Sequence, residues 1–494
     1  MSNLWSPPIE TTAAEERILR RCAKRKIFIF LRRHRHQLFD AEFQAQLCAM
    51  YDERERGLPR LPPALLCMAT LLQAALDVPD HEAVELTLDS RRWRMVLDFD
   101  GLEKPAYSQG SLFNFRERLI AHDMDKVLLD RTVALARETR GYSATRLRAA
   151  FDASPLWGAG RVEDSFNLIG RALWHVVRTA ADRRGVTPEQ LAADAGAPIV
   201  LASSVKAGLD LDWDDPDART IGLRQLLTQV ESLALWLRKE MADDLAAPPL
   251  KEEWETLLKL IEQDTEPDPD DAGPRIRRGV ARDRQISLSD PDMRHGRKSK
   301  SKLFNGYKRH VATDLDVPGQ GTKVETIAID RGYLGADVIR RRHASGDEVI
   351  CKPLPLRNGG RFTKSDFELD LARGTVSCPN GVVRPIRLGK TVRFPMAACT
   401  PCPTRAKCTR AKKAGRSLSI HPAEPLLAEL RQRLKTDAGR KALRERIAVE
   451  HSLAAIGLRQ GTRARYRGLR KNLFDLRRHA AVNNLHLLGE KAAA

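Results

Sequence analysis

Two apolar segments of this chain each lead into an aspartate, and a proline or glycine follows close behind. The first segment covers 146–151 and leads into Asp152, and the second covers 324–329 and leads into Asp330. We predict that both are buried strands that stop at the acid and the residue that breaks the strand. Acids at the C-terminal ends of two strands can meet on one rim of a sheet, which places strong limits on the fold.

A third acid, Glu450, lies in a segment with helical periodicity near the C-terminus. Arg446 precedes it by four residues, so on a helix the two share one face and the basic group supports the acid. Each acid alone is weak evidence, because an aspartate after a strand usually caps a turn and a lone glutamate is usually half of a surface ion pair. Together they predict ligands for hard divalent cations such as Mg²⁺, two of which can drive phosphoryl transfer.

In their order along the chain these motifs resemble an insertion-sequence transposase of the DDE superfamily. The resemblance is carried by Phe151-Asp152-Ala-Ser, Gly306-Tyr-Lys-Arg-His310, Asp330-Arg-Gly-Tyr and the spacing of Arg446 and Glu450, and it covers nearly the whole chain. It implies an α/β fold: an RNase-H-like catalytic core with a helical N-terminal domain, a helical insertion and a small zinc-knuckle-like insertion before the acidic helix.

The same resemblance implies a set of roles. The first Asp of the family falls on Asp152, the second on Asp330 and the Glu on Glu450, with Arg446 orienting Glu450. These acids would hold two Mg²⁺ ions while water cleaves a strand at the transposon end and the freed 3′-OH then attacks target DNA. The implied partners are double-stranded DNA, as transposon ends and target, and a second copy in a homodimer. The implied location is the bacterial cytoplasm, at the nucleoid.

Two departures separate the chain from many relatives. These relatives have a tyrosine three residues before the arginine and a lysine seven after the glutamate, where this chain has Leu443 and Gly457. Arg459 or Arg463 is the candidate for the missing phosphate contact. The second departure is that only 315–323 separates two predicted strands, where relatives usually have another strand and a helix.

The short linker raises the question of whether the catalytic core is complete enough to be active. In an RNase-H-like sheet it would join the second strand to the fourth across the first, a span of about 10 Å, and would leave one edge of the sheet exposed. The alternative function is therefore a catalytically inactive, internally shortened transposase derivative that only binds DNA. A zinc-bearing nucleic-acid-binding protein with no catalytic history is the third interpretation, and the ordered set of acids argues against it.

The succession of helix and strand patterns predicts four regions. They are a helical N-terminal DNA-binding and assembly domain over 1–140, the first part of the core over 141–355 with a helical insertion at about 163–272, a cysteine-bearing insertion over 356–420, and the C-terminal helical part of the core over 421–494.

Four of the eight cysteines are spaced C-x20-C-x2-C-x5-C, at Cys378, Cys399, Cys402 and Cys408. Four thiolates at such spacing suit tetrahedral Zn²⁺, so we predict a structural zinc site; the alternative is four unligated, partly buried thiols. His421 is a second candidate ligand. The other cysteines lie in apolar contexts and are interpreted as packing residues of a protein in a reducing cytoplasm.

The formal net charge of +19, from 84 Lys and Arg against 65 Asp and Glu, favours a polyanionic partner such as nucleic acid. Basic residues gather in 275–310 and in a helix expected over 459–471. The candidate DNA contacts are Arg297, Lys298, Lys300, Lys302, Lys308, Arg459, Arg463, Arg465 and Arg467. They would follow the DNA backbone without reading its sequence; the alternative is a solvated charged face.

Two aromatic residues and the absence of long apolar runs complete the sequence predictions. Trp157 and Tyr333 each follow a candidate acid and could stack on a flipped base, with packing in the core as the alternative for Trp157. No apolar run approaches the roughly 20 residues that span a bilayer, so we expect no membrane partner.

Overall fold

The structure is a computed structural model that describes residues 4–51, 61–99, 103–140, 146–270, 273–299, 301–314 and 323–492. The chain folds into two compact units. Unit 1 comprises Met1–Ala153, His310–Arg459 and Arg478–Ala494, and unit 2 comprises Ser154–Arg309 and Gln460–Arg477. None of the described helices combines the length and the apolar character needed to cross a membrane.

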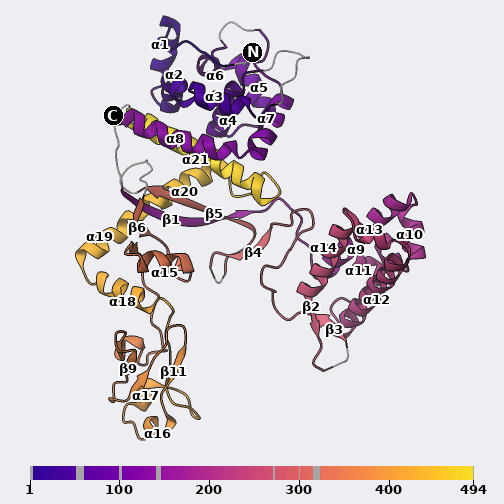
Figure 1. Cartoon of the computed structure of the whole chain (residues 1–494), viewed down its shortest axis with the longest axis vertical. Coiled ribbons are helices and arrows are strands. Elements are labelled where there is room, and N and C mark those ends of the chain that lie inside the picture. The colour runs from indigo at the N-terminus through magenta and orange to yellow at the C-terminus, as the bar shows by residue number, and fades with distance from the viewer. Residues whose placement is uncertain are drawn as a thin grey trace. The chain divides into compact units, whose positions relative to one another are not determined.

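Helices fill the N-terminal part of unit 1, as predicted. They are α1 (Ala13–Arg21), α2 (Lys26–Leu38), α3 (Ala41–Cys48), α4 (Pro63–Leu76), α5 (Asp80–Asp89), α6 (Arg91–Leu97), α7 (Gln109–Ala121) and α8 (Met124–Arg140). The C-terminal helix α21 (Leu469–Ala492) runs beside α8 (Figure 1), where Asn484 donates a hydrogen bond of 3.0 Å to the Thr132 hydroxyl.

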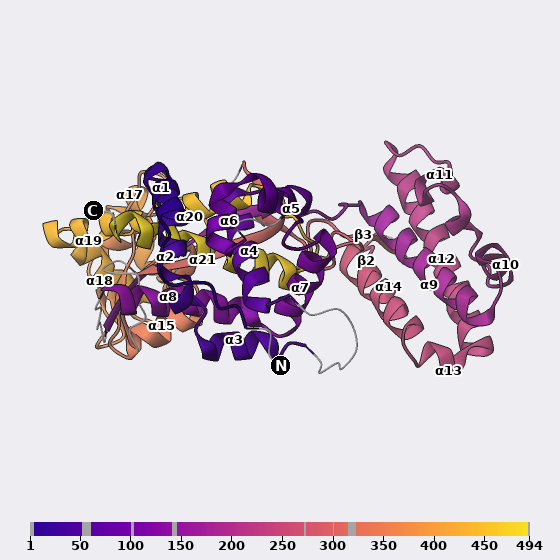
Figure 2. The ribbon, with the colours of Figure 1, turned by 90° about the horizontal axis from the view of Figure 1, so that it is seen from above.

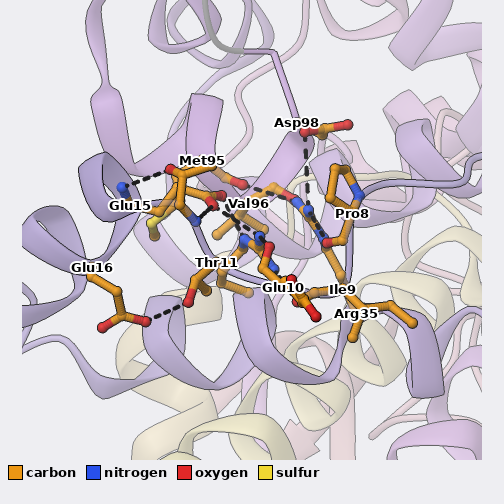
Figure 3. Close-up of polar contacts among 12 residues, drawn as sticks. Pro8, Ile9, Glu10, Thr11, Glu15, Glu16, Arg35, Met95, Val96 and Asp98 are labelled. Carbon is orange, nitrogen blue, oxygen red and sulfur yellow. Dashed lines mark hydrogen bonds and ion pairs between the residues drawn. The ribbon is translucent and has the colours of Figure 1, made fainter.

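Two buried arginines of α2 bind neighbouring helices of this domain, Arg32 to α1 and Arg35 to α6. Arg32 forms an ion pair of 2.6 Å with Glu15, and their side chains are 1% and 11% exposed. Arg35 donates to the carbonyl oxygens of Met95 and Val96 at 2.9 and 2.8 Å (Figure 3). Burial lowers the pKa of Arg35 to about 10. Buried guanidinium groups are tolerated because these acceptors replace water.

A five-stranded sheet carries the candidate acids. Its strands are β1 (Arg146–Trp157), β4 (Arg294–Arg297), β5 (Leu303–Asp314), β6 (Lys323–Ala328) and β7 (Glu348–Ile350), in the order β4-β5-β1-β6-β7. Strands β1, β6 and β7 are mutually parallel. The contacts of β5 with the end of β1 run in the opposite sense, from Gly158 against Asn305 to Ser154 against Arg309.

The path of the chain through the sheet confirms the predicted crossing. β5 and β6 are consecutive strands and lie on opposite sides of β1. The linker between them lies outside the described residues, apart from Lys323. The edge beyond β5 holds β4, which comes from upstream in the chain and pairs with Leu303–Gly306. The edge that we expected to be exposed is therefore covered along the first third of β5.

One strand prediction was wrong in its end point. β1 does not stop at Asp152 but continues through Pro155 to Trp157. A proline removes only its own N–H, and the neighbouring groups remain bonded: the Pro155 carbonyl accepts from Arg309 at 3.3 Å, and the Trp157 amide donates to the Thr462 carbonyl at 2.9 Å.

The region predicted as a helical insertion is helical and lies in unit 2 (Figure 2). Its helices are α9 (Ser165–Arg184), α10 (Pro188–Asp194), α11 (Val205–Leu209), α12 (Pro216–Glu240), α13 (Ala242–Leu245) and α14 (Leu250–Asp264). They enclose an apolar core that includes Leu173, Leu226 and Leu257. After α14, the short strands β2 (Thr265–Pro267) and β3 (Pro274–Ile276) pair antiparallel.

The cysteine-bearing region is built from short strands and single helical turns. These are β8 (Glu368–Asp370), β9 (Thr375–Ser377), β10 (Val383–Pro385), β11 (Thr391–Arg393), α16 (Met396–Cys399), α17 (Arg405–Cys408) and β12 (Ser417–Ser419). Phe367, Phe394 and Leu418 form its core.

The C-terminal region is helical, as expected, with one break. Its first helices are α18 (Glu424–Arg433), α19 (Asp437–Glu445) and α20 (Ile447–Gln460), and α21 follows. The single helix predicted over 459–471 is wrong, because residues 461–468 are non-helical. Gly461 and Gly468 adopt φ angles of 80° and 86°, which glycine accepts readily and which end the helical hydrogen bonding.

Replacing Arg32 with methionine tests the buried ion pair. We expect Arg32→Met to lower the free energy of unfolding by about 3–5 kcal/mol, because Glu15 loses its ion-pair partner while it stays largely buried. Urea unfolding followed by circular dichroism measures the loss. Arg33→Met is the control, since Arg33 is exposed on the same helix, and it should change stability by less than about 0.5 kcal/mol. Equal losses in the two variants would contradict this role.

Candidate active site

The strands β1 and β6 lead the first two predicted acids to the same edge of the sheet. Ala150 pairs with Ala328 in a parallel register. Asp152 lies two residues beyond Ala150 within β1, and Asp330 lies two residues beyond Ala328, just after the end of β6. The charges of both act on Tyr333, so the two carboxylates lie at the same edge of the sheet. One oxygen of each carboxylate accepts a hydrogen bond from the amide of the next residue, at 2.7 Å for Asp152 and 2.8 Å for Asp330.

Helix packing brings the third acid to that edge. Val449, in the first turn of α20, is fully buried against Ala150, Ala328 and Ile350, one residue from each of three parallel strands. Small side chains at the two alanine positions allow the helix to approach the sheet closely. Glu450 is the next residue of this helix, so the same packing that buries Val449 delivers its carboxylate to the edge of the sheet.

Arg446 links two of the three acids. It lies between α19 and α20, and one end of its guanidinium group contacts Asp152 Oδ2 at 3.2 Å. The other end forms an ion pair with Glu450 Oε1. The side chains of Arg446 and Asp152 are 20% and 19% exposed, whereas that of Glu450 is 49% exposed. Arg446 thus offsets the charges of two of the three carboxylates.

A histidine and a tyrosine complete the surroundings of the acids. Tyr333 ends the single turn η2 (Arg331–Tyr333) that begins directly after Asp330. Its hydroxyl is 2.8 Å from Nδ1 of His310, an exposed residue of β5. Burial raises the pKa of Tyr333, and the charges of Asp152 and Asp330 raise it further.

His310 has no assigned role in the sequence predictions, although it ends the Gly306-Tyr-Lys-Arg-His310 motif. The sequence could have indicated a role for His310, because its segment was predicted as the second strand of the sheet. That strand borders the strand that carries Asp152. Cys351 also lies near this edge, but it is 2% exposed in the apolar core of unit 1. Burial raises its pKa to about 12, with a further contribution from Asp330, which agrees with a packing role.

The four clustered cysteines line one cavity of about 20 Å³, which is room for a single water-sized occupant. All four are partly buried and free of disulfides. Burial raises the pKa of Cys408, and the other three thiols raise it further, since four thiolates repel one another. His421 is engaged elsewhere, because its Nδ1 accepts a 3.0 Å hydrogen bond from the Ala423 amide.

Within the described ranges, no group of three or more His, Cys, Asp and Glu side chains is arranged to hold a metal ion. A zinc knuckle is therefore not shown. For the carboxylates the physical reason is visible, because Arg446 occupies the space between Asp152 and Glu450. The donor atoms of the edge are nevertheless carboxylate oxygens, which suit Mg²⁺.

Most candidate DNA contacts are exposed residues of unit 2. Arg297, Lys298, Lys302 and Lys308 lie on or beside β4 and β5, and Arg463, Arg465 and Arg467 lie in 461–468. Lys300 is outside the described residues. Segment 461–468 is held in place by main-chain groups: the Gly468 amide donates to Asp290 and to the Tyr307 hydroxyl, both at 3.1 Å. The Ala464 amide donates to the Trp157 carbonyl at 2.6 Å.

Two residues differ from their sequence predictions. Arg459 is partly buried in unit 1, where it donates to Asn483 Oδ1 at 3.3 Å, and burial lowers its pKa. It is therefore set apart from the exposed basic residues. Trp157 is 45% exposed and contacts Phe304 edge-on, with ring centroids 6.4 Å apart, so the core-packing alternative for Trp157 is wrong.

Comparison with protein families matches both ends of the chain. The Transposase domain (DUF772) family matches residues 20–118, and the Transposase DDE domain family matches residues 384–488, which include Glu450. Asp152 and Asp330 lie between the matched ranges. Neither the curated proteins nor the solved structures yield a match.

Both matched families are transposase domains, and the structure is mixed α/β with a helical N-terminal region. The two matches support an insertion-sequence transposase of the DDE type. Transposases of this family act on DNA and generally use a divalent metal such as Mg²⁺.

Enlarging Ala150 tests whether the contact between α20 and the sheet places Glu450. We expect Ala150→Leu to cost about 1–3 kcal/mol of unfolding free energy by overpacking and to displace α20, with loss of any metal-dependent DNA nicking. Thermal unfolding and nicking of plasmid DNA are the measurements. Ala312→Leu, at an exposed position of β5, should leave stability nearly unchanged. An Ala150→Leu protein that is fully stable and active would show that this contact does not position the acid.

Proposed function

We propose that this chain is a metal-dependent DNA transposase that cleaves strands at insertion-sequence ends and transfers them to target DNA, with Asp152, Asp330 and Glu450 as its catalytic carboxylates. The observation that carries the proposal is the contact of Arg446 with both Asp152 and Glu450, beside the parallel strands β1 and β6 that lead to Asp152 and Asp330. Support also comes from the strand order, which has β1 between an antiparallel and a parallel neighbour. That order is the one expected of an RNase-H-like core.

The donor set of the edge fits the ions that the family uses. Carboxylate oxygens are preferred by Mg²⁺, which usually takes only one or two carboxylates from the protein and completes its shell with water and phosphate. When bound, two Mg²⁺ ions would activate the attacking oxygen and stabilise the leaving one. Asp152 and Asp330 would provide the fixed ligands, since each is held by a main-chain amide.

Arg446 would then act as a positioning residue. While it bridges Asp152 and Glu450, it offsets the repulsion between two carboxylates and keeps Glu450 close to the sheet. Binding of an ion would free the guanidinium group from Asp152. A released arginine next to a scissile phosphate can donate two parallel hydrogen bonds to it.

DNA binding would use the exposed basic residues of unit 2. These residues lie on short segments fixed by main-chain hydrogen bonds, which suits contact with a rigid phosphate backbone. The helical N-terminal region would serve DNA binding and assembly, and a homodimer would bring two transposon ends together. We propose residues 140, 355 and 420 as the limits of these functional regions.

A structural Zn²⁺ site is the second part of the proposal. It rests on the cavity of about 20 Å³ that Cys378, Cys399, Cys402 and Cys408 line together. The small core of this region, with its short strands, is the kind of fold that a metal commonly stabilises.

A catalytically inactive derivative that only binds DNA is the second candidate function. The specific observation in its favour is the short connection from β5 to β6, which spans 315–322. β4 covers only the first residues of β5, so part of this strand lacks a neighbour on that side among the described residues.

Removing single carboxylates separates the two functions. We expect Asp152→Asn, Asp330→Asn and Glu450→Gln each to reduce Mg²⁺-dependent nicking of DNA that carries the element ends by at least about 10³-fold, because each removes a ligand of the ions. Binding to the same DNA should persist. Asp337→Asn, an exposed acid of α15 (Asp337–Ala344), is the matched control and should nick normally. Binding without nicking by the unmutated protein would favour the inactive derivative.

Metal analysis tests the zinc site. We expect about one zinc per chain in purified protein and its loss in Cys402→Ser, because three thiolates hold zinc far less tightly than four. Cys48→Ser, which changes a cysteine of the N-terminal helices, should retain the metal. Protein that contains no zinc, or that keeps it in Cys402→Ser, would overturn the assignment.

A further inference from the structure

The cysteine-bearing region holds more than half of the net positive charge of the chain, yet none of the candidate DNA contacts named above lies in it. Residues 356–420 contain fourteen Lys and Arg against three Asp and Glu, which is +11 of the total of +19. No acid occurs between Asp370 and Glu424, a stretch that contains eleven Lys and Arg. So much charge of one sign on a small region attracts polyanions.

Some of these cations have a structural role. Arg405 donates a hydrogen bond of 2.8 Å to the carbonyl oxygen of Ala411. Arg416 donates to the Phe362 carbonyl oxygen at 3.1 Å, and its guanidinium group lies over the ring of Phe367. Because these groups are used to hold the region together, the cations that can take a ligand have to be found among the exposed ones.

The strands β11 and β12 form an antiparallel ribbon with two unlike faces. The pairs in register are Thr391 with Ser419, Val392 with Leu418, and Arg393 with Ser417. Side chains alternate between the two faces of a strand. Val392 and Leu418 therefore pack into the core of the region, whereas the other four residues are exposed on the opposite side. We call these four the outward face of the ribbon.

The outward face offers one guanidinium group and three hydroxyl groups, and it contains no acid. In the part of the chain that the structure describes, Arg393 forms no ion pair. Main-chain pairing continues beyond both strand ends, since the Phe394 amide donates to Arg416 at 2.8 Å and the Ile420 amide donates to Lys390 at 2.9 Å. The donors of the outward face are thus carried on a support with a defined geometry.

We propose that the outward face of the ribbon binds backbone phosphates of double-stranded DNA, without reading their sequence. Guanidinium and hydroxyl groups are among the donors that proteins use for phosphate oxygens, and the positive charge of the region complements that of DNA. The choice of DNA as the polyanion rests on the proposed function. The inference adds a second DNA-contacting surface, separate from the basic residues of unit 2.

The test removes or reverses the charge of Arg393 and measures how DNA affinity depends on salt. Each phosphate contact contributes about 0.9 to the slope of log affinity against log salt concentration. We therefore expect Arg393→Gln to lower the slope by about 0.9 and the affinity by about tenfold. Arg393→Glu should lower the affinity further. Ser419→Glu, which puts an acid on the same face, should also weaken binding.

Matched controls change the same charge at another place. Lys251→Gln and Lys251→Glu alter an exposed lysine of α14 that pairs with Glu255, and they should leave the slope unchanged. The probes are an element-end duplex and an unrelated duplex of equal length, without added Mg²⁺ so that no strand is cut. Both should lose the same affinity, because phosphate contacts carry no sequence information. Thermal unfolding checks that the variants are folded, and Ser419→Glu decides if the Arg393 variants are not.

Three results would overturn the inference. An unchanged slope in the folded Arg393 and Ser419 variants means that the outward face does not contact DNA. A loss confined to the element-end duplex means that the contact reads sequence. Loss of polyglutamate binding with DNA affinity retained means that the face takes an acidic protein instead. If the unmutated protein binds neither duplex, the proposed function fails as well, which distinguishes that failure from the other three.

Discussion

The pairing of Ala150 with Ala328 is the interaction on which the site depends. It aligns the parts of β1 and β6 that lead to Asp152 and Asp330 at one edge of the sheet. The same two small side chains receive Val449, and this contact carries Glu450 to the edge. Three acids separated by 178 and 120 residues of sequence are thus placed by one patch of apolar packing.

The charges at this edge determine how the three carboxylates interact. Three carboxylates at one edge repel one another, and a single guanidinium group offsets this repulsion for the pair that it bridges. In the proposed function, Arg446 and a divalent cation would compete for the same oxygens, so the arginine would set how readily the site accepts metal.

The sequence was most informative where short-range patterns determine structure. The strands that precede Asp152 and Asp330 were predictable from their apolar runs, and the pairing of Arg446 with Glu450 from the four-residue spacing. The extension of β1 to Trp157 was not, because it depends on Thr462 and Arg309, which are distant in sequence. Nor was the break at 461–468, which two glycines and the contacts of Gly468 with Asp290 and Tyr307 create.

Tertiary contacts also explain the residues whose roles changed. Arg459 was grouped with its basic neighbours by sequence, but in α20 it is partly buried and donates to Asn483. His310 ends a sequence motif and has no role in the sequence predictions, and β5 places it within 2.8 Å of the Tyr333 hydroxyl. Neither fact can be predicted from the local sequence, because each depends on which strands and helices are neighbours in the fold.

The most direct test of the account is a crystal structure of the chain soaked in Mn²⁺, a close substitute for Mg²⁺ whose anomalous scattering marks its position. We expect a Mn²⁺ peak bounded by the carboxylates of Asp152, Asp330 and Glu450, with the Arg446 guanidinium group moved off Asp152. Mn²⁺ bound elsewhere, with Arg446 still bridging Asp152 and Glu450, would contradict it.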